Sequence, residues 1–218
     1  MAAKYLSAAN AAALDKDLMS RGAFSLDQLM ELAGLSVSQV GGDGLVAARH
    51  LWHYGYKPTI YYPKQGKNEL YQRLSTQLRN LSISFTDDFP SALRETDHIV
   101  DAIFGFSFSG TLRDPFPSII TALSESSLPI TSIDAPSSWD ITNGPPPSGP
   151  GANFMPQYLI SLTAPKPLVK HFKGRHFLGG RFVTPEIAEK YNLQLPAYEG
   201  IDQIVEMPME EEESGGKP

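Results

Sequence analysis

The sequence predicts an α/β protein in which helices cover both faces of a mostly parallel sheet, a three-layer αβα sandwich. Short apolar runs of strand length alternate with longer segments of helical pattern along the 218 residues. Such alternation favours parallel strands joined by right-handed crossovers. Two acids, Asp101 and Asp134, each follow an apolar run. They are therefore expected at the sheet edge where open α/β sheets bind their ligands.

The first half of the chain is predicted to be mainly helical. An alanine-rich segment favours one helix, and Ser25 with Gln28 forms a capping-box pattern that begins a second. The expected elements are helices over 5–19, 25–40 and 44–54, a strand over 59–62, a helix over 69–81 and a weak strand over 83–85.

The second half alternates more regularly between the two kinds of structure. Pro115 stands near the first turn of a predicted helix, where proline is permitted, and the proline-rich and glycine-rich run over 144–151 predicts a surface loop. The expected elements are a helical turn over 91–95, a strand over 98–104, a helix over 115–124, strands over 130–133 and 158–162, an edge strand over 177–183 and a helix over 185–191.

The composition narrows the classes of function. There is no cysteine, which excludes disulfides, zinc–thiolate sites and a thiol nucleophile. The net charge of −6 comes mostly from residues 206–218, with five acids and one lysine, so a broad surface for nucleic acid is not indicated. No apolar run has the length needed to span a bilayer. We expect one domain over 1–206 and a disordered acidic tail over 207–218.

A glycine cluster precedes the third predicted helix. Gly41, Gly42 and Gly44 surround Asp43, and glycines at a helix N-terminus let backbone N–H groups approach a phosphate. The alternative is a helix–helix turn with Asp43 as N-cap. A phosphate loop needs a preceding strand, whereas the residues before Gly41 have a helical pattern.

Each of the two acids also has a functional and a structural interpretation. Asp101 could bind a cation or transfer protons, or it could cap the turn after its strand. The aromatic and small residues over 104–110 suit a lip over a planar ligand, but aromatic rings also simply pack. Asp134, followed by Pro136, Ser137 and Ser138, suits an acid–base centre. The same residues also favour an Asx turn.

Five segments, taken together, resemble a known family. They are 27–34 (DQLMELAG), 41–50 (GGDGLVAARH), 100–107 (VDAIFGFS), 132–137 (SIDAPS) and 161–166 (SLTAPK). Their order and sequence are similar to those of the NAD(P)H-hydrate epimerases, the YjeF N-terminal family, over residues 5 to 205. The resemblance implies a Rossmann-like fold and an isomerase that interconverts the R and S forms of hydrated NADH and NADPH. A separate dehydratase then restores the cofactor.

The resemblance also implies the residues of the site. Potassium would be bound by Asp101 and Ser137, and Asp134 is the candidate catalytic group. Substrate contacts are implied at Gly41, Gly42, Asp43, Gly105, Phe106, Ser107, Phe108, Ser109, Gly110, Thr111 and Asp134. The reacting carbon can lose its configuration through an iminium or through ring opening, and either route needs a proton moved near one carbon, which a carboxylate can do.

One departure from the family pattern lies before Gly41. The family carries a strand and then a loop of the type GPGNNGGDG, whereas here Val40 leads directly into Gly41. The chain thus lacks a central parallel strand, half of the phosphate loop and an asparagine that helps to bind potassium. One large core truncation costs about 2–5 kcal/mol, against a total stability of about 5–15 kcal/mol. We therefore expect a weakly stable or inactive protein. A smaller departure is Ser109, where some relatives have lysine, so no catalytic lysine is assigned there.

The main alternative is a role without catalysis. Related domains occur in mRNA-decapping scaffold proteins, where they mediate dimerisation and contacts with RNA or protein. The acids at 101 and 134 favour the enzyme, while the shortened loop favours the scaffold. The resemblance further implies a homodimer in the cytoplasm, with the mitochondrion as a second location, and no nucleic-acid or membrane partner is expected.

Overall fold

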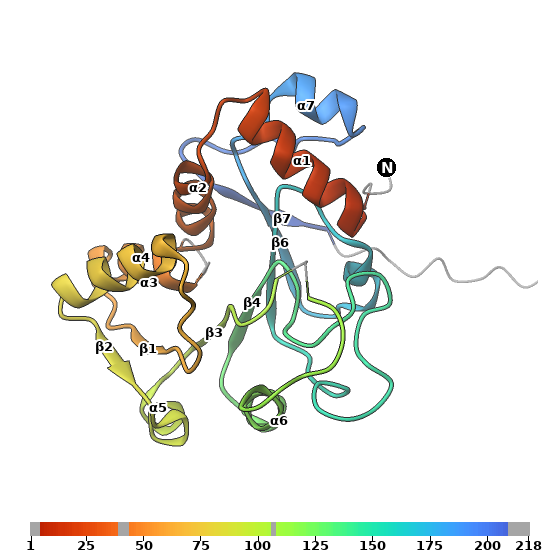
Figure 1. Ribbon diagram of the computed structural model, residues 1–218. Helices are drawn as coiled ribbons and strands as arrows, with labels where there is room; N and C mark the ends of the chain where they lie inside the picture. The colour runs from red at the N-terminus through yellow and green to blue at the C-terminus, as the bar shows by residue number, and fades with distance from the viewer. Residues whose placement is uncertain (1–4, 39–43, 106–107, 209–218) are drawn as a thin grey trace, which may run out of the picture.

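The computed structural model describes residues 5–38, 44–105 and 108–208. Helices and strands alternate through most of this chain (Figure 1). In order they are α1 (Ala8–Ser20), α2 (Leu26–Ser38), α3 (Gly44–His53), β1 (Thr59–Tyr61), α4 (Glu69–Asn80), β2 (Ser84–Thr86), α5 (Phe89–Glu95), β3 (Ile99–Asp101), α6 (Phe116–Glu125), β4 (Ile130–Ile133), β5 (Tyr158–Leu162), the 3-10 helix η1 (Pro167–His171), β6 (Arg175–Gly179), α7 (Pro185–Lys190) and β7 (Ile204–Met207).

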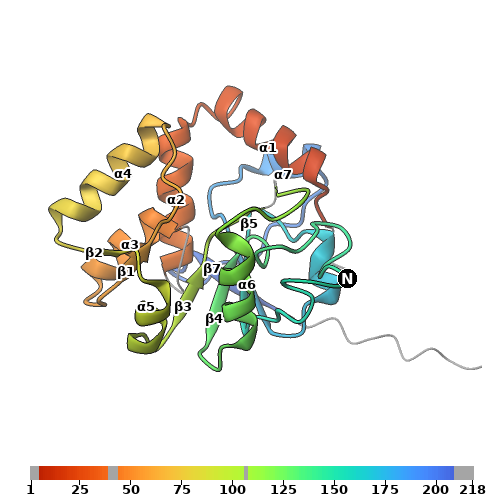
Figure 2. The same cartoon turned by 60° about the horizontal axis from the view of Figure 1, so that its bottom comes forward.

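The strands form two sheets instead of one. The larger sheet has the order β3-β4-β5-β6-β7, with parallel pairs except for the antiparallel pair of β6 and β7. The smaller sheet is the parallel pair β1-β2. Figures 1 and 2 place β2, β1, β3 and β4 side by side in that order. The sheet is therefore divided between β1 and β3.

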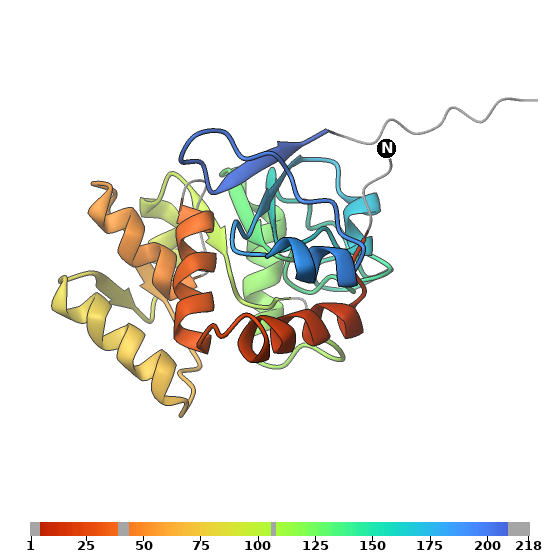
Figure 3. The same cartoon turned by 90° about the horizontal axis from the view of Figure 1, so that it is seen from above.

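Helices lie on both sides of the strands. Seen from above, α1, α2 and α7 cover the larger sheet (Figure 3). Val37 of α2 packs there against Ile133 and Ile160, while α6 covers the opposite face through Ile119 and Ile120. Strand residues alternate between the two faces because successive side chains point to opposite sides. The three-layer arrangement predicted from the sequence is confirmed.

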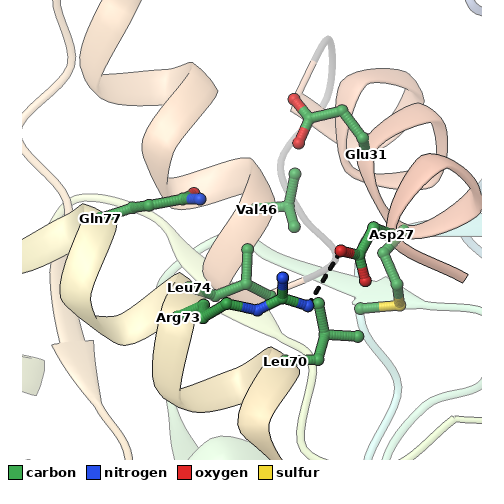
Figure 4. Close-up of a pocket in the computed structure, with 8 residues that line it drawn as sticks. Asp27, Glu31, Val46, Leu70, Arg73, Leu74 and Gln77 are labelled. Carbon is green, nitrogen blue, oxygen red and sulfur yellow. Dashed lines mark hydrogen bonds and ion pairs between the residues drawn. The ribbon is translucent and has the colours of Figure 1, made fainter.

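The smaller sheet has a separate core. Ala48 of α3 and Leu78 of α4 pack against its strands. An ion pair of 2.9 Å between Asp27 and Arg73 fastens α4 to α2 across a small pocket of about 100 Å³ (Figure 4). None of the predicted site residues lines this pocket, so it belongs to the packing of the three helices.

Several element boundaries confirm the sequence analysis. Ser25 and Gln28 form the expected reciprocal capping box, with bonds of 2.8 and 3.1 Å. The strands over 130–133 and 158–162 have the predicted bounds. The strand expected over 98–104 is shorter and ends at Asp101, because its carboxylate accepts hydrogen bonds that turn the chain there.

The last part of the sheet corrects the prediction. The strand expected over 177–183 runs instead from Arg175 to Gly179. It is not an edge strand, because β7 pairs with its outer side. Met207, placed in the acidic tail by the sequence analysis, is the last residue of β7. The remainder of that tail from residue 209 lies outside the described residues. Within the part that the structure describes, no helix is both long and apolar enough to cross a membrane.

Candidate active site

Asp101 and Asp134 lie at the same edge of the larger sheet. Asp101 is the last residue of β3, and Asp134 follows the last residue of its neighbour β4. The strands are parallel, with Asp101 opposite Ser132, so their carboxyl ends meet at one edge. Both acids line one cavity of about 1560 Å³. The predicted pairing of the two carboxylates in one site is therefore supported by the geometry.

Asp101 is held in a buried network of hydroxyl and backbone donors. Its Oδ2 accepts hydrogen bonds from Ser132 Oγ at 2.7 Å and from the Ser137 N–H at 2.9 Å. Its Oδ1 accepts from Ser137 Oγ at 2.5 Å. Burial raises the pKa of the Asp101 carboxyl, and the hydrogen bonds from both serines oppose that rise. A positive charge placed beside the Asp101 carboxyl would therefore favour its ionised form.

Asp134 forms a buried ion pair that the sequence analysis did not predict. Its Oδ1 contacts Lys166 Nζ, and it also accepts a hydrogen bond of 3.2 Å from the Leu162 N–H. Lys166 donates a second bond of 2.7 Å to the Leu162 carbonyl. The lysine lies just beyond β5 in the segment 161–166. The signal for it was a lysine four residues after the end of an apolar strand.

The backbone of Asp134 has an uncommon conformation. Its φ is +62°, in the left-handed region, which non-glycine residues seldom adopt. The residue is kept there by backbone bonds, since its N–H donates to the Ile160 carbonyl at 2.7 Å. Such strained residues cluster at functional sites. The conformation directs the carboxylate toward Lys166 and the cavity.

A third acid lies near this ion pair. Asp15 of α1 lines the same cavity as Asp134 and Lys166. Burial raises the pKa of the Asp15 carboxyl, while the charge of Lys166 lowers it and that of Asp134 raises it. The sequence analysis did not select Asp15, because it lies in the middle of a helix far from both strands in sequence. Asp15, Asp101 and Asp134 thus reach the cavity from three separate parts of the chain.

The described part of the glycine cluster also reaches this edge. Gly44 begins α3, and a Cβ added to it would lie 3.5 Å from the Cβ of Ala102, the residue after Asp101. The N-terminus of α3 therefore lies beside the end of β3, where a helix N-terminus suits an anion. Gly41, Gly42 and Asp43, predicted as substrate contacts, lie outside the described residues.

Only part of the loop after β3 lines the cavity. Gly105 lines it, whereas the Phe108 ring stacks on Phe104 with 4.4 Å between centroids. Ser109, Gly110 and Thr111 are exposed. Phe106 and Ser107 lie outside the described residues. The contact between the two rings matches the packing interpretation of these aromatics.

The oxygen atoms around Asp101 are of the kind that potassium binds. A carboxylate and the Ser137 hydroxyl are oxygen donors, and hard cations of this kind favour oxygen ligands. Ser137 Oγ accepts a hydrogen bond of 3.2 Å from the Phe104 N–H and donates to Asp101, so one lone pair on this oxygen remains for a cation. In the described residues no cluster of three histidine, cysteine or acidic side chains could hold a metal.

The chain is similar to known proteins in family, sequence and structure. A family model described as "YjeF-related protein N-terminus" matches residues 32–168. A protein of Sclerotinia sclerotiorum named NAD(P)H-hydrate epimerase is 78% identical over 235 residues, covering 98% of this chain and 99% of its own length. One of Phaeosphaeria nodorum with the same name is 66% identical over 227 residues, covering 94% and 95%.

A solved structure extends the similarity to the fold. The crystal structure of yeast YNL200c has a TM-score of 0.85 and 36% identity, and covers 94% of this chain and 100% of its own. The alignment with the Sclerotinia protein is 235 positions long, 17 more than the 218 residues of this chain. That relative therefore has at least 17 residues without a counterpart here.

Proposed function

The chain belongs to the family of YjeF-related proteins, and from this membership we propose how its own residues act in the family's reaction. It is an isomerase that interconverts the R and S forms of hydrated NADH and NADPH. The observation that supports a role for its residues is the buried pair of Asp134 and Lys166 on the cavity that Asp101 also lines.

We propose that Asp134 moves the proton that the epimerisation requires. The reacting carbon carries a hydroxyl and is bonded to the ring nitrogen, so it loses its configuration when the C–O bond breaks or the ring opens. In C–O cleavage the leaving oxygen gains a proton and the water that returns loses one. In ring opening the C–N bond breaks, the hydroxyl loses its proton as the aldehyde forms while the ring nitrogen gains one, and both transfers are reversed on closure. Lys166 and the Leu162 N–H bind Oδ1 of Asp134, which leaves Oδ2 to face the substrate. A positioned carboxylate contributes about 10²–10⁴-fold to such proton transfers.

Lys166 has a supporting role in this proposal. Its ammonium group is buried between Asp134 and the Leu162 carbonyl, so its charge keeps the carboxylate in place inside a site of low polarity. We propose that the same positive charge also stabilises negative charge on a substrate oxygen beside Asp134. The pair therefore supplies a base and a fixed positive charge side by side.

We propose potassium as the cofactor of the site, held by Asp101 and Ser137. When bound, this cation would offset negative charge near the substrate diphosphate. The proposal is supported by the oxygen donors around Asp101 and by the burial that raises the pKa of its carboxyl. A potassium-specific rise in melting temperature, absent with sodium and absent in Asp101→Asn, is the expected result.

The alternative, a scaffold without catalysis, is not favoured. The Sclerotinia and Phaeosphaeria proteins described above, at 78% and 66% identity, are both named NAD(P)H-hydrate epimerase, and this chain has both acids at one cavity. We further propose that a dehydratase on another chain consumes the product, because an epimerase serves a repair pathway only when a later enzyme accepts one epimer. We also propose that the chain forms a homodimer and that it is located in the cytoplasm or the mitochondrion.

The decisive experiment measures interconversion of the two epimers by the full chain. We expect Asp134→Ala to lower turnover by about 10²–10⁴-fold. The matched control is Asp140→Ala, because Asp140 accepts hydrogen bonds from Thr142 and Asn143 in an exposed turn. Equal turnover of the parent and Asp134→Ala would remove Asp134 from the reaction.

A further inference from the structure

Three charged side chains follow three strands, in the order in which those strands lie. Asp134 follows β4, and Asp101 is the last residue of β3. Lys64 lies three residues beyond the end of β1. All three line the cavity of about 1560 Å³, and Figures 1 and 2 place β1, β3 and β4 in that order. A ligand that lies along these strand ends from β4 to β1 would meet Asp134 first and Lys64 last.

Two aromatic rings connect Lys64 with the centre of the site. Its ammonium nitrogen lies over the Phe116 ring, 5.5 Å from the centroid. Phe116 packs edge-on against Phe104 with 4.9 Å between the centroids. The Phe104 N–H donates to Ser137 Oγ at 3.2 Å, and both rings line the cavity. Lys64 therefore lies two ring contacts away from the oxygen atoms around Asp101.

The ammonium group of Lys64 is available to an anion. Lys166, which lines the same cavity, is already paired with Asp134. Among the residues that the structure describes, no acid forms an ion pair with Lys64. The side chain is exposed, and its contact with the Phe116 ring is a weak one at such a place. The three N–H donors of the ammonium therefore remain for a ligand.

A second lysine on the same strand shows what is particular to Lys64. Lys57 is also exposed and also lines the cavity. It precedes β1, however, whereas Lys64 follows this strand. Of the two, Lys64 is the one that the rings of Phe116 and Phe104 link to the site. The two lysines share charge, cavity and strand, so they differ mainly in their distance from the site.

The substrates are dinucleotides whose parts have a fixed order. The hydrated ring is at one end, the diphosphate is in the middle and the adenosine is at the other end. With the ring at Asp134, the diphosphate falls near the N-terminus of α3, which lies beside the end of β3 and suits an anion. The adenosine then reaches the region of Lys64. Hydrated NADPH differs from hydrated NADH by one phosphate on the adenosine ribose.

We propose that Lys64 binds this additional phosphate, and that the chain therefore prefers hydrated NADPH to hydrated NADH. The proposal rests on the proposed function, because it takes its substrates from there. A lysine ammonium is a compact charge that bonds phosphate oxygens through charge-assisted hydrogen bonds. Since Lys64 is exposed, salt should weaken the contact.

The first test compares kcat/KM for the two substrates with the full chain. We expect the parent to favour hydrated NADPH by about tenfold. Lys64→Ala should abolish this preference by raising the KM for hydrated NADPH, because the ribose phosphate takes no part in the reaction. Lys64→Arg keeps the charge and should restore most of the preference. Lys57→Ala is the matched control and should retain the preference of the parent.

The second test measures the same contact without turnover. NADP⁺ and NAD⁺ have the adenosine ends of the two substrates, and their binding to the full chain can be followed by isothermal titration calorimetry. We expect a Kd for NADP⁺ about tenfold below that for NAD⁺ at low salt. The difference should disappear in Lys64→Ala. It should also shrink in the parent when choline chloride is added at constant potassium.

Three results would each overturn the proposal. They are equal binding of NADP⁺ and NAD⁺ by the parent, equal loss of preference in Lys57→Ala and Lys64→Ala, and a loss in Lys64→Ala that is the same for both substrates, as a structural role would cause. If NADP⁺ is preferred through Lys64 but no epimerisation is measured, the assignment of Lys64 stands and the proposed function fails. Epimerisation without any preference gives the opposite result.

Discussion

The larger and smaller sheets are built from similar strands but differ in burial. All four residues of β4 are buried, whereas β1 has an exposed Thr59 and half-buried Ile60 and Tyr61. The acids of the proposed site come from the larger sheet, and α3, whose N-terminus suits an anion, packs on the smaller one. The acids of the proposed site therefore lie on the more deeply buried sheet, whereas the helix N-terminus that suits an anion belongs to a helix packed on the more exposed one.

Apart from the effect on turnover, the largest expected effect is the loss of unfolding free energy when a buried side chain is truncated. Ile160 of β5 is fully buried and Ile60 of β1 is half-buried. Ile160→Ala should cost about 2–5 kcal/mol of unfolding free energy, and Ile60→Ala about 1 kcal/mol or less. Urea unfolding followed by circular dichroism measures both. Equal costs would mean that the smaller sheet is packed as well as the larger one.

Hydrogen exchange should separate the two sheets without any mutation. A two-stranded sheet is marginally stable by itself, and local opening exposes its amides without global unfolding. We expect amides of β1 and β2 to exchange about 100-fold faster than those of β4 and β5, equivalent to about 2.7 kcal/mol in opening free energy. Indistinguishable protection would show one cooperative unit and remove the distinction.

Mild acid should weaken the larger sheet through His176. Burial lowers the pKa of His176, which lies 2.9 Å from Ser161 Oγ, to about 4. The unfolded chain binds this proton near pH 6.5, so stability is lost as the pH falls below that value. Between pH 7 and 5 the loss should be about 2 kcal/mol.

The matched variant for this pH effect is His176→Gln, which retains a group able to bond Ser161. Thermal melts at pH 7 and 5 should show a smaller decrease in the variant than in the parent, with carboxyl titrations common to both. A parallel decrease in the two proteins would assign the acid sensitivity to other groups. The amides of β1 and β2 should not respond, because His176 belongs to β6.

The smallest effect concerns Asp15. Removing its charge near Lys166 and Asp134 should change turnover by about tenfold or less, equivalent to about 1.4 kcal/mol in the barrier. Asp15→Asn should also lose part of the acid limb of the pH–rate profile, because burial raises the pKa of this carboxyl. Asp27→Asn is the control, since Asp27 pairs with Arg73 on the far side of α2. An unchanged profile would make Asp15 a structural residue.

The sequence predicted the positions of two acids that directly follow strands. Asp101 and Asp134 were found because an acid after a short apolar run marks the edge of a sheet. Lys166 was not assigned, although it also follows a strand, because its partner lies 32 residues earlier and nothing local indicates that contact. β7 was missed because four residues beside an acidic tail carry little periodicity, and pairing with β6 creates the strand. Long-range contacts, which local pattern does not encode, account for both omissions.

The outer border of the larger sheet has a consequence for behaviour at high concentration. Arg175 of β6 holds Glu206 of β7 through two bonds of 2.8 Å each. Charged side chains on an edge strand discourage its pairing with the edge strand of another molecule. Aggregation through unpaired strand edges should therefore begin where the sheet is divided, between β1 and β3. The solubility of the purified protein then reports how well those two edges are covered.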